Sequence, residues 1–189
     1  MNRTVTLAAL CLIVLLTPAF AQDEVPKTLA DSVGNTLQWT EDEFYSVAEA
    51  MPEAKYDYIP TAGQFESTRS FAEQVKHVAC AQFAFFNEIE RKTPPEGCER
   101  GGPSPARTKA ELLKYLKDSF DYGNNVLQTI DAKNGLDRVE GRYAAPNTKL
   151  GLAVAAVWHM ADHYGQIVEY LRMNGIVPPA TQKYGLKVR

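Results

Sequence analysis

The chain has 189 residues, of which 20 are Lys or Arg and 23 are Asp or Glu, so its formal net charge is -3. The charged residues are dispersed, and no basic stripe typical of nucleic-acid binding is present. A chain of this length suits one domain around a single apolar core. We therefore expect one domain and no nucleic-acid partner.

The first 21 residues have the pattern of a secretory signal peptide. Arg3 supplies the positive charge, an apolar run covers residues 7–16, and Pro18 then interrupts the run. A small-x-small motif ends at Ala21, as signal peptidase requires. We predict cleavage after Ala21 and a periplasmic or secreted protein.

Two alternatives to a cleaved signal are less consistent with this segment. A membrane anchor needs roughly 20 apolar residues, and the run is shorter. A lipoprotein signal would place its cysteine at the end of the run, whereas Cys11 lies inside it. No second hydrophobic run follows. The mature domain, residues 22–189, is therefore expected to have no membrane span.

The first predicted helix extends from Leu29 to Met51, where apolar residues recur at helical spacing. Gly34 and Thr40 weaken this pattern, and Pro52 ends the helix. A connection rich in turn-forming residues follows over residues 56–63.

Two capping boxes mark the starts of the second and third helices. Ser70 is followed by Glu73, and Thr108 by Glu111, so that each hydroxyl and carboxylate can bond a free backbone N–H. The second helix ends before residues 93–95, Thr-Pro-Pro. Both helices have apolar faces, formed by Phe71, Val75, Val78, Ala81, Phe85 and Ile89 and by Leu112, Leu113, Leu116, Phe120, Val126, Leu127 and Ile130.

The fourth helix follows a polar crossover loop over residues 131–146. Asn147 or Thr148 is expected to cap it, and Gly175 with the prolines that follow ends it. No strand pattern competes with these helices. Four helices around one core predict an all-α protein, a four-helix bundle.

The mature chain retains two cysteines, Cys80 and Cys98. An even number in an exported protein is compatible with a disulfide. The alternative is a buried, apolar Cys80 and a solvent-facing Cys98 in the loop. The sequence cannot test the bridge geometry, so both remain open.

The only three histidines have an informative placement. His159 and His163 are four residues apart on the apolar side of the fourth helix, so their rings lie on one side of it. His77, near the start of the second helix, can supply a third nitrogen if these helices are neighbours. The alternative is that each is a neutral, hydrogen-bonded core residue. The spacing suggests a metal site with an open coordination position but does not establish one.

Helix four contains an H-x3-H motif at His159 and His163, followed by Gly-Gln and by Tyr-Leu-Arg-x-x-Gly-x-x-Pro-Pro from Tyr170. With residues 50–58 and 70–78, this closely resembles the DinB/YfiT-like superfamily over essentially the whole mature chain. The resemblance implies an up-down-down-up bundle, usually dimeric. It also implies one divalent ion, Zn²⁺ or Ni²⁺, on the histidines at positions 77, 159 and 163.

The resemblance also implies a class of function. Characterised relatives include thiol-dependent S-transferases and an isomerase that uses a low-molecular-weight thiol. We therefore expect a metal-dependent transferase or hydrolase acting on a small molecule. An exported protein, however, is separated from the cytosolic thiols. The alternatives are a non-catalytic metal-binding or stress-associated envelope protein, and a structural bundle whose histidines have lost their role.

Other residues near the histidines are weaker candidates. Gln166 can hydrogen-bond a water molecule at the site, or bond across the helix interface instead. Asp162 can hold a histidine N–H, although the helical phase turns it toward solvent. Trp158, Tyr164 and Tyr170 are more typical of core or interface aromatics than of substrate contacts.

Overall fold

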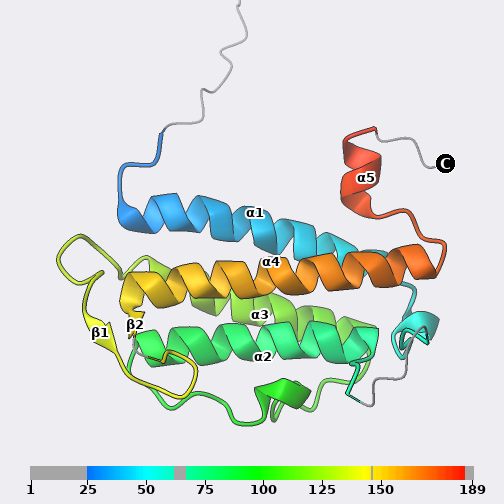
Figure 1. Cartoon of the computed structure of the whole chain (residues 1–189), viewed down its shortest axis with the longest axis horizontal. Coiled ribbons are helices and arrows are strands. Elements are labelled where there is room, and N and C mark those ends of the chain that lie inside the picture. Colours follow the sequence, from blue (N-terminus) through cyan, green and yellow to red (C-terminus); the bar gives the residue numbers. More distant parts are fainter. Residues whose placement is uncertain (1–24, 62–66, 146, 186–189) are drawn as a thin grey trace, which may run out of the picture.

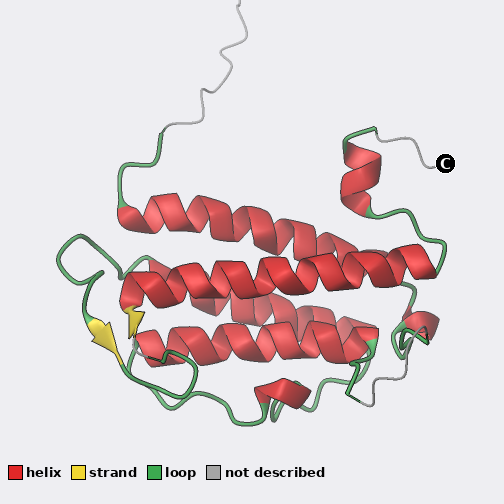
Figure 2. Ribbon diagram, viewed as in Figure 1, coloured by secondary structure: helices red, strands yellow, loops and turns green. Residues whose placement is uncertain are grey.

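A computed structural model describes residues 25–61, 67–145 and 147–185. It is the predicted all-α four-helix bundle, with a very small amount of strand (Figure 2). The long helices are α1 (Leu29–Ala50), α2 (Phe71–Ile89), α3 (Lys109–Leu127) and α4 (Lys149–Met173). The short elements are η1 (Glu53–Lys55), η2 (Cys98–Arg100), β1 (Arg138–Val139), β2 (Asn147–Thr148) and α5 (Pro179–Lys183).

The helices run up, down, down and up, as the resemblance implied (Figure 1). Lys109, which begins α3, donates from Nζ to the carbonyl of Met51 at the end of α1, at 2.9 Å. Lys55, just after α1, donates to the carbonyl of Asn174, just after α4, at 3.2 Å. Helix α1 therefore packs against α4 and α3, and α2 packs against α3 and α4. The α2–α4 edge lies opposite the α1–α3 edge.

The predicted helix starts are present. Ser70 Oγ accepts from the Glu73 N–H at 3.2 Å, and Glu73 Oε2 accepts from the Ser70 N–H at 2.8 Å. The same reciprocal pair joins Thr108 and Glu111. Thr148 is the residue that caps α4, accepting from the Gly151 N–H at 3.1 Å. Each cap satisfies donors that the first turn of a helix leaves free.

Apolar side chains from all four long helices fill the space between them, and the fully buried ones include Leu37, Phe44, Phe86, Leu116 and Ile167. Each contributes on the order of 2 kcal/mol through removal of apolar surface from water. The apolar core therefore holds the four helices together, and with them the side chains that lie between α2 and α4.

The α3–α4 crossover was expected to be loop only, and this was wrong in one respect. Strand β1, inside the predicted loop, forms a two-residue antiparallel pair with β2, which directly precedes α4. Two residues are too few for alternation to be recognisable in a sequence. The buried Glu88 carboxylate fixes the loop by accepting from the N–H groups of Tyr143 at 2.9 Å and Ala144 at 2.6 Å. Gly141 lies so close that a Cβ there would be 2.2 Å from Glu88 Cδ.

The predicted signal segment, residues 1–21, lies outside the described residues. Within the part of the chain that the structure describes, no helix has both the length and the hydropathy needed to cross a bilayer.

Candidate metal centre

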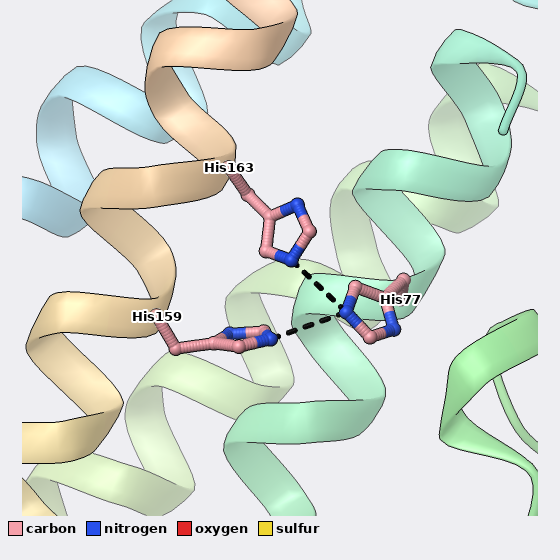
Figure 3. Close-up of side chains that lie close together, drawn as sticks. All are labelled: His77, His159 and His163. Atoms are coloured by element: carbon pink, nitrogen blue, oxygen red, sulfur yellow. Dashed lines mark hydrogen bonds between the residues drawn. The ribbon is translucent and has the colours of Figure 1, made fainter. Parts of the chain in front are cut away.

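The three histidines converge between α2 and α4. His77 projects from the second turn of α2, and His159 and His163 project from successive turns of α4 (Figure 3). The Nε2 atom of His77 lies 3.1 Å from His159 Nε2 and 3.1 Å from His163 Nε2. One nitrogen from each ring thus faces a common point, and all of these atoms lie within 4.8 Å of one another.

A backbone carbonyl fixes the tautomer of His77. Its Nδ1 atom lies 2.6 Å from the carbonyl oxygen of Cys98. A carbonyl can only accept, so Nδ1 carries the proton and donates it. The neutral ring then presents the Nε2 lone pair to the other two histidines, which is the form that binds a metal ion.

Burial keeps the three rings neutral. Desolvation lowers the pKa of His77, and it lowers the pKa of His159 to about 3 with help from the neighbouring His163 and His77. The pKa of His163 falls to about 4, again mainly through burial, with further lowering from His77 and Arg69. Three neutral imidazoles at neutral pH are three available electron-pair donors.

The donor geometry fits a divalent ion better than it fits a hydrogen-bonded cluster. His77 Nε2 has one lone pair but two imidazole neighbours, so it cannot bond both well. The Nδ1 atoms of His159 and His163 are buried without a hydrogen-bond partner among the described residues. Tetrahedral Zn²⁺ bonded to nitrogen at about 2.0–2.1 Å separates its ligands by about 3.3 Å, close to the spacing found here.

Gln166 and Asp162 contact each other. Gln166 Nε2 donates to Asp162 Oδ2 at 2.9 Å, and Gln166 Oε1 accepts from Gln74 Nε2 of α2 at 2.8 Å. Gln166 therefore bonds across the helix interface, and Asp162 is exposed. Both act on His163 only weakly, each raising its pKa slightly against the effect of burial. Gln74, a polar residue on the buried face of α2, was not singled out from the sequence.

Cys80 and Cys98 form a disulfide that links α2 to η2. Cys98 is buried, with 1% of its surface exposed, and does not face solvent. Its carbonyl is the group that accepts from His77. This contact has no signature in the sequence, because every residue type has a backbone carbonyl.

Phe85 forms an apolar wall beside the cluster. Its ring packs edge-on to His159 at a centroid distance of 5.3 Å and to Tyr143 of the crossover loop at 6.3 Å. The other aromatics proposed from the sequence lie elsewhere: Trp158 is 69% exposed, and the Tyr170 hydroxyl donates to the Arg69 carbonyl. The Tyr164 hydroxyl donates to Glu43 of α1.

The protein is thus an up-down-down-up helical bundle with a candidate metal site. Three histidines from two adjacent helices converge at that site. A family model described as the DinB superfamily matches residues 36–167. The chain belongs to the DinB superfamily, and the resemblance seen in the sequence is confirmed.

Solved structures share this fold. A conserved protein from Enterococcus faecalis is 16% identical with a TM-score of 0.60, and the match covers 76% of this chain and 95% of that one. A protein from Exiguobacterium sibiricum, described as a member of the DinB family, is 16% identical with a TM-score of 0.61, covering 78% and 92%. At this identity the likeness concerns the fold alone. The comparison with curated proteins gives no match.

Proposed function

We propose that the protein binds one divalent metal ion, Zn²⁺ or Ni²⁺, on His77, His159 and His163, and acts as a metal-dependent transferase or hydrolase on a small molecule. The observation that carries this proposal is the convergence of three neutral imidazole nitrogens, two pairs of which are 3.1 Å apart. A set of three protein ligands is typical of catalytic rather than structural zinc sites, because it leaves a coordination position open.

The bound ion would supply a Lewis acid that can activate a thiol or a water molecule. The chain's own residues prepare the site for it. The Cys98 carbonyl orients His77, and burial holds all three rings neutral, so that no ligand charge reduces that of the ion. The Phe85 ring packs against one side of His159 and shields that side from solvent.

A non-catalytic, metal-binding or stress-associated envelope protein is the second candidate. One observation favours it: among the described residues, no carboxylate is hydrogen-bonded to the histidines. Asp162, the nearest candidate on α4, bonds Gln166 instead. A catalytic role would thus need a general base that is not hydrogen-bonded to the histidines, or one supplied by water or by the substrate itself.

Export and dimerisation are also part of the proposal. The Cys80–Cys98 disulfide supports export, since disulfides persist mainly in oxidising compartments. Two exposed apolar side chains one turn apart on α4, Val154 at 50% and Trp158 at 69%, support a homodimer. The substrate or a low-molecular-weight thiol would be the small-molecule partner.

Metal analysis of the purified mature protein tests the proposal. We expect close to one ion per chain, and His163→Ala should lose most of it because two nitrogens hold a borderline metal poorly. Asp162→Asn, an exposed change one residue away, should retain the metal. Wild-type protein that binds neither Zn²⁺ nor Ni²⁺ after refolding would disprove the site.

Activity panels then separate the two candidates. Thiol-transfer and hydrolase assays, each run with and without chelator, should reveal a metal-dependent activity if the protein is an enzyme. Full metal loading with no activity in either panel would favour the non-catalytic alternative.

A further inference from the structure

Cys98 contacts α2 in two ways within a single helical turn. Its Sγ is bonded to Cys80, and its carbonyl accepts from Nδ1 of His77 at 2.6 Å. His77 and Cys80 are three residues apart, so both point toward the η2 segment. The covalent bond and the hydrogen bond therefore hold the same residue against the same stretch of α2.

We propose that the Cys80–Cys98 disulfide is a positioning element of the metal centre, which holds the Cys98 carbonyl in place and thereby fixes His77 in its metal-binding tautomer. The oxidised protein has a competent site, and the reduced protein has a weakened one. This inference rests on the proposed metal binding and adds that the redox state of the disulfide regulates the metal affinity.

The disulfide is the strongest link between the η2 segment and the rest of the molecule. An ion pair between Glu99 and Arg142, at 3.0 Å, is exposed on both sides, and such pairs contribute little. Arg69 Nε also donates to the Glu99 carbonyl at 2.9 Å, but from an exposed position. Gly97 and Gly101, on either side of η2, have left-handed backbone conformations, with φ of 70° and 88°. Among the described helices, α2 is the main packing partner of this short segment.

Loss of the carbonyl contact would change the chemistry of His77. A neutral imidazole without a fixed partner exchanges its proton between the two nitrogens. With the proton on Nε2, the ring has no lone pair to offer toward His159 and His163. Removal of such a supporting contact typically costs about 10- to 100-fold in metal affinity.

The redox step is a two-electron reduction. A dithiol transfers two electrons and two protons to the S–S bond, which breaks into the Cys80 and Cys98 thiols, and the dithiol becomes a cyclic disulfide. A thiol-disulfide exchange partner in the envelope is the class of reaction that would set this state.

The experiment compares wild type with the double variant Cys80→Ala/Cys98→Ala, which removes the bridge without adding a thiol ligand. Arg142→Gln is the matched control, because it frees the same segment from its ion pair and leaves the disulfide intact. Imidazole ¹⁵N NMR of the metal-free proteins reports the tautomer of His77, and competition titration with Zn²⁺ gives the affinity.

We expect wild type and Arg142→Gln to show His77 protonated at Nδ1 alone and to bind Zn²⁺ equally. The double variant should show a mixture of tautomers and bind Zn²⁺ about 10- to 100-fold more weakly. A disulfide with a merely structural role would lower the melting temperature without moving the tautomer. A folded double variant with the wild-type tautomer and an affinity within threefold would overturn the inference.

A second measurement covers the case in which the double variant does not fold. Wild type reduced with a dithiol in the absence of metal should show the same tautomer mixture, and an unchanged Nδ1–H signal in the folded, reduced protein would contradict the proposal. Absence of Zn²⁺ binding by oxidised wild type would instead remove the proposed function, and the NMR result would still decide the role of the bridge.

Discussion

The two opposite edges of the bundle each bury ionisable groups, with different consequences. At the α2–α4 edge, burial lowers the pKa of His159 to about 3 and that of His163 to about 4. At the α1–α3 edge, burial raises the pKa of Glu41 to about 7, while Asn124 Nδ2 donates to its Oε2 at 2.8 Å. The cause is the same in both places, since an apolar surrounding disfavours the charged form.

The difference concerns what the neutral form can do. A neutral imidazole keeps a lone pair and remains a metal ligand, whereas a protonated carboxyl loses most of its affinity for a cation. Desolvation therefore leaves the α2–α4 edge able to hold a metal ion and makes the α1–α3 edge a poor site for one. Burial also makes the free energy of unfolding depend on pH in opposite directions at the two edges.

The largest expected effect is acid sensitivity of the metal-free protein. Because the folded pKa values of the histidines lie below the unfolded value of 6.5, the unfolded chain binds more protons between about pH 4 and 6.5. The free energy of unfolding should therefore fall as the pH drops through this window, by about 1.4 kcal/mol per pH unit for each proton. Denaturant unfolding of chelated protein at several pH values measures this slope.

His159→Gln is the matched variant for this test. Its free energy of unfolding should fall less steeply as the pH drops, by the equivalent of up to one bound proton. An identical slope in the variant would mean that carboxylates, rather than the histidines, govern the acid response.

The opposite effect is expected at Glu41. Its folded pKa of about 7 lies above the ordinary glutamate value of 4.5, so the folded protein keeps a proton that the unfolded chain releases. The contribution of Glu41 to stability is therefore lost as the pH rises from 4.5 through 7, and it is unaffected below 4.5. Glu41→Gln should stabilise the protein by roughly 1–3 kcal/mol at pH 8 and have little effect at pH 4.

Asp42→Asn, an exposed neighbour on α1, serves as the control and should give a much smaller pH-dependent difference, because burial raises the pKa of Glu41 more than the charge of Asp42 does. If Glu41→Gln destabilises the protein equally at both pH values, the carboxyl is held by contacts other than those seen here.

The smallest effect compares the two capping boxes. Ser70 caps α2, which carries His77, and Thr108 caps α3, which carries Asn124. Each substitution by Ala should cost about 1 kcal/mol of unfolding free energy, because the backbone N–H of Glu73 or of Glu111 loses the hydroxyl that accepts from it. Only Ser70→Ala should also weaken Zn²⁺ binding, by a small factor. Chemical denaturation and a Zn²⁺ titration of both variants check this, and equal affinities would show that the start of α2 does not influence the site.

The sequence determined the elements and the identity of the three histidines. Apolar residues at helical spacing and two capping boxes predicted the long helices, because these signals are local and each is contained within one helix. The spacing of His159 and His163 placed both rings on one side of α4 for the same reason. The H-x3-H motif and its continuation indicated the family, which the family match bears out.

Only the tertiary structure decided how distant parts meet. Packing of α2 against α4 brings His77 to the pair on α4, and no local pattern specifies which helices are neighbours. The Cys98 carbonyl at His77, the Glu88 carboxylate under the crossover loop and the Phe85 wall all join residues far apart in sequence. Such contacts depend on the path of the backbone, which side-chain periodicity does not encode.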